Sequence, residues 1–74
     1  MTIGQAIHDY RKAAGLTMKQ LADRMQKNSN VRITPGNICK YEHDLVNPEW
    51  YTIMALAKEL GPGFVQEALR EYEK

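Results

Sequence analysis

Apolar residues recur three or four positions apart in five segments of this 74-residue chain. That spacing places them on one face of a helix and predicts five amphipathic helices. Threonine, proline and glycine stand between the segments, where they favour helix starts and stops. Thr17 is expected to cap the second helix, and Thr34 followed by Pro35 is typical of a helix start. The predicted helices cover residues 3–14, 17–26, 35–42, 49–60 and 63–73.

Between the second and third helices, residues 26–32 read QKNSNVR, a polar stretch without a period. We interpret this stretch as an extra loop. No segment of useful length alternates between apolar and polar residues, as a half-buried strand would. The sequence therefore predicts an all-α fold in which residues 1–74 form a single small domain.

With 43% hydrophobic and 26% charged residues, the chain has the composition of a folded globular domain. Its apolar runs are short and its N-terminus lacks a signal-peptide pattern, so we expect a cytoplasmic protein with no membrane contact. Cys39 is the one cysteine, which excludes an internal disulfide and a multi-cysteine zinc site. His8 and His43 have no carboxylate or thiol at ligand spacing, so neither a metal site nor a cofactor is expected.

The formal net charge of +1 hides an uneven distribution along the chain. Residues 1–40 carry seven lysines and arginines against two acids, whereas residues 41–74 carry three against seven. A basic first half would attract phosphate groups, and the acidic second half would face away from them. The alternative is a mixed, solvated surface on which these charges form no single patch.

Three stretches of the chain, GLTMKQLADRM, ITPGNICKYE and NPEWYTIMALAKELG, resemble the helix-turn-helix family of phage Cro and CI repressors. The resemblance covers roughly residues 3–61. Its pattern falls on Arg11, Gly15, Leu21, Ala22, Ile38, Glu42, Pro48, Leu60 and Gly61. It implies a compact five-helix, lambda-repressor-like domain whose third helix lies in the major groove of DNA. It also implies an ion pair in which Arg11 and Glu42 pin the first helix to the end of the third.

The function that this resemblance implies is a transcriptional regulator that binds operator sites in double-stranded DNA. The third helix would then face the bases with Pro35, Gly36, Asn37 and Lys40. Residues expected near the DNA backbone are Thr17, Lys19, Lys27 and Arg32. A homodimer through residues 63–73 is also expected, because relatives pair to read two half-sites. The apolar stripe Phe64, Val65, Ala68, Leu69 and Tyr72 looks too wide for one small core, although this helix can instead pack wholly on its own domain.

Several residues depart from the family pattern and keep a second function open. Pro35 and Gly36 offer no donor or acceptor to a base edge, which leaves Asn37 to read adenine and Lys40 to read guanine. Met18 stands where relatives often have a glutamine, and the loop HDLVN is acidic and apolar where they tend to carry lysines. The alternative is a phage antirepressor, or an antitoxin, that uses the same surface on a repressor protein. Its contact residues would be Asn37, Lys40, His43, Leu45 and Val46.

An enzyme is the least supported class of function. The sequence has no paired acids, no nucleophile with a nearby base and no phosphate-binding glycine loop, so no residue is a catalytic candidate. Cys39 is interpreted as a small filler beside the buried Ile38. His43 is interpreted as a cap at the C-terminus of its helix, where the helix dipole favours a positive charge.

Overall fold

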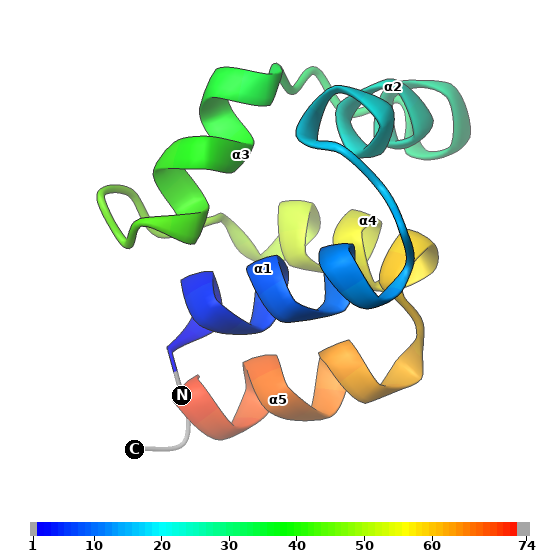
Figure 1. Ribbon diagram of the computed structural model, residues 1–74. Coiled ribbons are helices and arrows are strands. Elements are labelled where there is room, and N and C mark those ends of the chain that lie inside the picture. Colours follow the sequence, from blue (N-terminus) through cyan, green and yellow to red (C-terminus); the bar gives the residue numbers. More distant parts are fainter. Residues whose placement is uncertain (1, 73–74) are drawn as a thin grey trace.

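The computed structural model describes residues 2–72, with side chains up to Arg70, and the regular secondary structure of this part is all helical, without strands (Figure 1). Its helices are α1 (Ile3–Ala13), α2 (Met18–Ser29), α3 (Pro35–Glu42), α4 (Trp50–Leu60) and α5 (Pro62–Tyr72). The prediction of an all-α fold is therefore confirmed for the described residues. None of their helices is both long and apolar enough to cross a membrane.

Three threonines set the starts of the first three helices. Thr2, Thr17 and Thr34 each accept a hydrogen bond from the backbone N–H three residues further on. The backbone N–H groups of Thr17 and Thr34 in turn donate to the side-chain oxygens of Gln20 and Asn37. Each such cap contributes about 1 kcal/mol to helix stability, which explains why these helices start where the sequence predicts.

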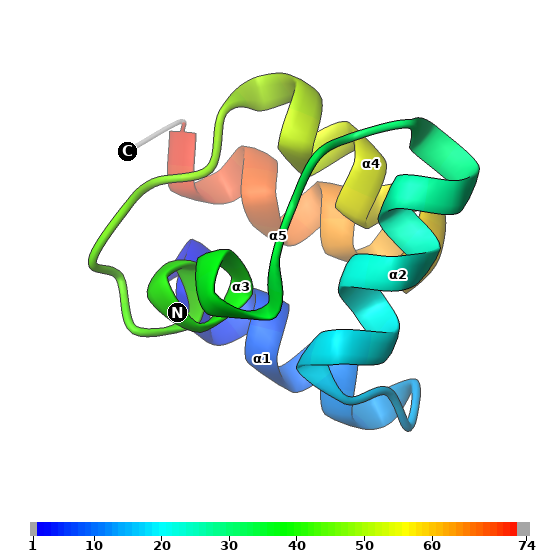
Figure 2. The same ribbon diagram turned by 90° about the horizontal axis from the view of Figure 1, so that it is seen from above.

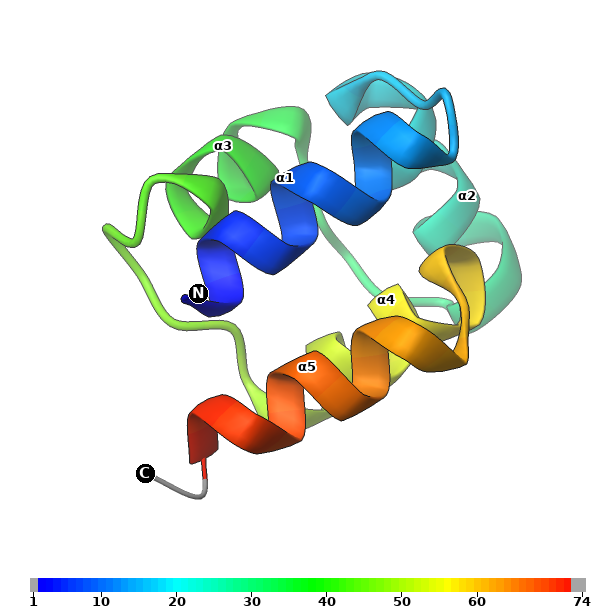
Figure 3. The ribbon, with the colours of Figure 1, turned by 60° about the horizontal axis from the view of Figure 1, so that its bottom comes forward.

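α1 lies in the middle of the domain, with α3 on one side and α5 on the other (Figures 1 and 3). α4 and α5 form a helical hairpin, and α2 packs on both α3 and α4. All five helices contribute to one core, whose largest fully buried side chains are Ile7, Leu21, Met25, Ile38, Leu56 and Phe64. Ile38 is the one residue of α3 that is buried as a whole, whereas Pro35, Gly36 and Lys40 are exposed and give this helix an open outer side.

The connection between α2 and α3 differs from the sequence-based interpretation. α2 continues to Ser29, and Asn30 ends it in the left-handed conformation with a φ of 54°. The interpretation of residues 26–32 as an extra loop is therefore wrong for its first four residues. The connection consists of residues 30–34, which run as an extended segment to the start of α3 (Figure 2).

Tertiary contacts explain why this polar stretch is helical without an apolar period. The Asn28 side chain donates a hydrogen bond to Glu59 of α4 at 2.7 Å. The Gln26 side chain donates another to the carbonyl oxygen of Ile33, which is itself buried in the core. The first bond holds the last turn of α2 against α4, 31 positions away, and the second ties it to the connection that follows. Periodicity along a single helix reveals neither contact.

Candidate nucleic-acid interface

The position of α3 is set first by its close contact with α1 at Gly4. A Cβ atom built on Gly4 would collide with the carbonyl oxygen of Tyr41 and lie 2.9 Å from that of Glu42. Both carbonyls belong to the last turn of α3, and backbone atoms cannot move aside cheaply. Only glycine therefore allows the two helices to approach this closely.

An ion pair between Arg11 and Glu42 holds the same two helices together. Arg11 Nε donates to Glu42 Oε2 at 2.6 Å, and Nη2 donates to Oε1 at 3.1 Å. Arg11 Nη1 donates to the carbonyl oxygen of Leu16, which ties in the segment ahead of α2. The two side chains are only 8% and 3% exposed. The ion pair predicted from the resemblance is therefore present and buried.

The electrostatics of this pair favour its charged form. Burial alone would raise the pKa of Glu42, but hydrogen bonds and charges from Arg11 and His8 outweigh it and hold that pKa below its ordinary value. The hydrogen bond to Glu42 likewise raises the pKa of Arg11, against the opposing effect of burial. Both groups are thus ionised at neutral pH, and removing either would leave a buried charge without its partner.

Both histidines have partners that the sequence analysis missed. His8 Nδ1 lies 2.9 Å from Glu42 Oε1, and His43 Nδ1 lies 2.8 Å from the carbonyl oxygen of Cys39 and 3.6 Å from its Sγ. The statement that no carboxylate or thiol stands near them is therefore wrong. His8 meets its carboxylate only through folding, whereas the four-residue spacing of Cys39 and His43 is visible in the sequence. Within the described residues, no group of three or more histidine, cysteine, aspartate or glutamate side chains is placed to hold a metal ion.

Asp44 is a structural residue that the sequence analysis treated only as part of an acidic loop. It follows α3 in the left-handed conformation, with a φ of 58°. Its carboxylate accepts hydrogen bonds from the Thr2 hydroxyl at 2.9 Å and from the Gly4 backbone N–H at 3.2 Å. The negative charge therefore lies at the N-terminus of α1, where the helix dipole stabilises it.

The exposed side of α3 begins with Pro35 and Gly36, whose side chains have no hydrogen-bond donor or acceptor for a base. Pro35, Gly36 and Lys40 are exposed, and Asn37 is half-buried. A Cβ atom on Gly36 would meet only the Thr34 hydroxyl at an ordinary 3.7 Å, so the fold does not require glycine there. The bare backbone at Gly36 is instead free to approach a binding partner closely.

Asn37 is occupied by the cap of its own helix. Its Oδ1 accepts hydrogen bonds from the Thr34 backbone N–H at 3.1 Å and from the Thr34 hydroxyl at 2.8 Å. Reading adenine with two bonds needs both the oxygen and the nitrogen of the amide. Asn37 would therefore have to give up part of its cap to do so, and Lys40 is the long hydrogen-bond donor on the exposed side of α3.

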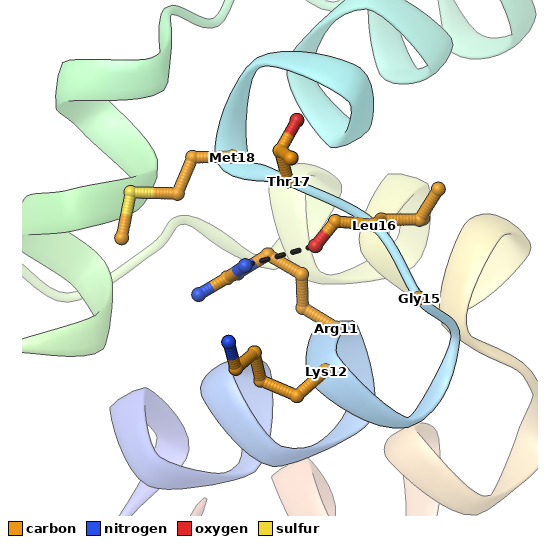
Figure 4. A pocket seen from close by; sticks show the side chains of 6 residues that line it. All are labelled: Arg11, Lys12, Gly15, Leu16, Thr17 and Met18. Carbon is orange, nitrogen blue, oxygen red and sulfur yellow. Dashed lines mark hydrogen bonds between the residues drawn. The ribbon is translucent and has the colours of Figure 1, made fainter.

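The start of α2 borders an open pocket of about 430 Å³. Figure 4 shows its lining, in which the Arg11 guanidinium and the Lys12 ammonium point to the same side and Met18 extends toward α3. Thr17 is exposed at the helix N-terminus, and Lys19 is exposed in the first turn. Because Arg11 is paired with Glu42, the cations available to an anion at this helix start are the exposed Lys12 and Lys19.

The four predicted backbone-contacting residues fall into two separate groups. Thr17 and Lys19 lie at the start of α2, whereas Lys27 lies in its last turn and Arg32 lies in the connection to α3. Lys19 and Lys27 are eight positions apart, which is about 12 Å along the helix axis. All four residues are exposed, so each is free to meet a partner, although the structure does not bring them into one cluster.

Two apolar side chains stand out in the loop after α3. Leu45 is 73% exposed and Val46 is 47% exposed. The Leu45 backbone is nevertheless fixed, because its N–H donates to the carbonyl oxygen of Lys40 and the N–H of Asp44 donates to that of Tyr41. This pair of bonds is the Schellman ending of a helix, in which the residue at the Leu45 position usually packs back on the helix. Here its side chain remains in solvent.

The stripe proposed for a homodimer is used mainly inside the domain. Phe64 and Ala68 are fully buried, and the Phe64 ring packs edge-on against Tyr10 at a centroid distance of 6.0 Å. The interpretation that this stripe is too wide for one core is therefore wrong for these two residues. Leu69 remains 54% exposed and Val65 is half-buried, while the side chain of Tyr72 lies outside those that the structure describes.

Comparisons of the chain with models of protein families, with curated proteins and with solved structures gave no match.

Proposed function

We propose that this protein is a small helix-turn-helix transcriptional regulator of lambda-repressor-like fold that binds operator DNA through α3. The main support is the placement of α3, which is fixed on its inner side and free on its outer side. Gly4, Ile38 and the Arg11–Glu42 pair hold the inner side. A rigid helix with an open outer face, braced by a second helix, is what insertion into the major groove requires.

The distribution of exposed charge supports a phosphate-rich partner. Within residues 2–40, six basic side chains are exposed and only two acidic ones, Asp9 and Asp23. The basic set comprises Lys12, Lys19, Arg24, Lys27, Arg32 and Lys40. Lys12 and Lys19 flank the start of α2, where the helix dipole adds to their attraction for an anion. The remaining basic residue of this part, Arg11, is buried in its ion pair with Glu42 and is not available to a partner.

The base-reading capacity of α3 is small in this proposal. Lys40 is the residue best placed to donate to guanine, while Pro35 and Gly36 supply shape and Asn37 stays in its cap. Affinity then comes mainly from phosphate contacts, and sequence preference from Lys40 together with the shape of the groove.

Fluorescence anisotropy with a labelled duplex of about 20 base pairs tests this function. About four to six phosphate contacts give a plot of log affinity against log salt with a slope near −4 to −5. Lys19→Ala should weaken binding, whereas Lys58→Ala, which removes an exposed lysine of α4, should not. Absence of binding at low salt, or equal losses in the two variants, would contradict the proposal.

One observation favours a second candidate function, an antirepressor or antitoxin that binds a protein. Leu45 and Val46 are exposed in the loop beside α3, where an apolar side chain offers a phosphate no hydrogen bond or charge. The centre of a protein interface is apolar and its rim is polar. Lys40 and His43 are exposed polar neighbours of that kind.

A further inference from the structure

Two atoms that commonly bind metal ions meet at the end of α3. Cys39 lies in this helix and His43 is its C-cap residue, four positions further on. Side chains at that spacing lie one turn apart on the same face of a helix. Cys39 Sγ lies 3.6 Å from His43 Nδ1. A thiolate sulfur and an imidazole nitrogen are ligands that Zn²⁺ prefers in proteins.

We propose that Cys39 and His43 form a binding site for a zinc ion on the exposed side of α3. In a tetrahedral zinc site the Zn–S bond is about 2.3 Å and the Zn–N bond about 2.0 Å, which places sulfur and nitrogen about 3.5 Å apart. The separation of 3.6 Å in this structure therefore needs almost no change to hold the ion. The proposal does not depend on DNA binding.

The proton on His43 Nδ1 lies where the ion would bind. This nitrogen is 2.8 Å from the carbonyl oxygen of Cys39 and donates to it, with Sγ as a second, longer acceptor. The same carbonyl accepts the His43 backbone N–H at 3.1 Å, so it keeps a partner when the imidazole turns to an ion. On binding, the thiol releases its proton to solvent, and the imidazole carries its proton on Nε2 in place of Nδ1. One proton is released for each ion, so binding should weaken as the pH falls.

The surroundings of the pair leave it accessible and supply no third ligand. His43 is exposed and Cys39 is half-buried. The two neighbouring carboxylates are used elsewhere, because Glu42 is bonded to Arg11 and Asp44 is bonded to the start of α1. Water, or a group of a binding partner, would therefore complete the tetrahedron. A site with open positions exchanges its ligands, unlike a structural zinc site with four protein ligands.

The ion would lie on the surface that α3 presents to a partner. Gly36, Cys39, Lys40 and His43 follow one another at steps of three or four residues, so they share one face of the helix. Zn²⁺ bound by one thiolate adds a net positive charge beside Lys40. Occupancy of the site therefore changes both the charge and the shape that a partner meets on this helix.

Titration of the reduced full chain with Cd²⁺ and Zn²⁺ tests the site. Cd²⁺ takes the same ligands, and its bond to a thiolate gives an ultraviolet charge-transfer band. Because Cys39 is the only cysteine, this band reports on one position. We expect the band to saturate at one ion per chain, and Zn²⁺ to displace Cd²⁺ and to slow alkylation of the thiol by iodoacetamide. Absence of the band, or a band and an alkylation rate that Zn²⁺ does not change, would overturn the proposal.

Matched variants assign the two ligands. Cys39→Ser should abolish the band, and His43→Gln should weaken Cd²⁺ binding on the order of 100-fold, because a single remaining ligand loses the benefit of linkage. The chain has two histidines, so His8→Gln is the control, and it should leave Cd²⁺ binding unchanged. Circular dichroism checks that each variant keeps its helix content. Equal affinity of His43→Gln and the parent protein would show that the thiol binds alone, and an equal loss in His8→Gln would show that the effect is indirect. Either result rejects the site.

Discussion

Arg11 and Glu42 lie 31 positions apart in the sequence and form a two-point ion pair that fixes the last turn of α3 against α1. His8 adds a third contact to the same carboxylate. The pair lies beneath α3, where a partner cannot reach it, so its role is to position the exposed side of that helix. A buried ion pair of this kind specifies geometry more than it adds stability, and its loss is costly.

Replacing Glu42 with alanine should lower the free energy of unfolding by about 3 kcal/mol, because it leaves the Arg11 guanidinium buried without its anion. Urea denaturation of the two proteins measures the difference. Glu67→Ala provides the control, since Glu67 pairs with Arg70 on the surface of α5 at 3.6 Å and such pairs contribute less than about 1 kcal/mol. Equal stability of Glu42→Ala and the parent protein would show that the pair has no structural role.

The same carboxylate predicts a dependence of stability on pH. The pKa of Glu42 is lower in the folded state than the value of about 4.3 in an unfolded chain. The folded state therefore binds this proton less readily, and the stabilisation is fully present above about pH 4.3 and lost as the pH falls through the folded pKa. Between about pH 5 and pH 2, the parent should lose more stability than Glu42→Gln, which has no group to protonate there. Parallel pH profiles for these two proteins would contradict the prediction.

The sequence predicts the helix starts well because each depends on local chemistry. Thr17, Thr34 and Pro35 act through neighbours within one turn, so their effect can be inferred without knowledge of the fold. The end of α2 depends instead on Asn28 meeting Glu59 of α4. A bond between residues 31 positions apart leaves no periodic signal, so periodicity alone predicts a loop for this polar stretch.

In the candidate site, too, the features that depend on neighbouring residues can be predicted from sequence, and those that depend on tertiary contacts cannot. The Arg11–Glu42 pair was expected only from a family resemblance, because no local pattern links the two residues. The capping role of Asn37 could have been inferred, since a polar side chain three residues after a threonine cap is a known helix-start pattern. The inward placement of Asp44 could not, because it depends on how α1 approaches the end of α3.

Asp44 should contribute both a backbone conformation and a helix cap. Asp44→Ala forces alanine into the left-handed region and removes the bonds to Thr2 and Gly4, so it should cost about 2 kcal/mol. Asp44→Gly loses the same bonds but adopts that conformation without strain, so it should cost about 1 kcal/mol. Thermal unfolding of both variants separates the two contributions. If alanine proves no worse than glycine, the left-handed conformation carries no strain.

Two lysines should have different effects if the protein binds DNA. Lys40→Ala, on the exposed side of α3, should reduce the preference for a selected sequence over random DNA by about 1–3 kcal/mol. Lys19→Ala, at the start of α2, should weaken binding to all sequences alike and make the salt slope about one unit shallower. Anisotropy titrations with both kinds of duplex provide the comparison. Identical effects on selected and random DNA would reject the roles assigned to these residues.

A substitution at Leu45 should distinguish the two candidate functions, DNA binding and protein binding. Its backbone is fixed by the hydrogen bond to Lys40, while its side chain is 73% exposed, so Leu45→Asp should leave the fold and the unfolding free energy nearly unchanged. In a DNA-binding protein the new charge acts only by repelling phosphate, and moderate salt should diminish its effect. In an antirepressor the same charge enters the apolar centre of an interface, where burying it without a partner should abolish the complex at any salt concentration.

Titration of Leu45→Asp against DNA and against a phage-type repressor distinguishes these outcomes. Lys58→Ala, which lowers the net charge by the same one unit but on α4, controls for the general change in net charge. Tight, sequence-selective DNA binding that survives Leu45→Asp would identify an operator-binding protein and leave no role for Leu45 in recognition. Weak, unselective DNA binding, together with a repressor complex that Leu45→Asp destroys and Lys58→Ala preserves, would establish the protein-binding function. The distinction follows from where the charge is placed: phosphate meets it across water, whereas an apolar interface must remove the water first.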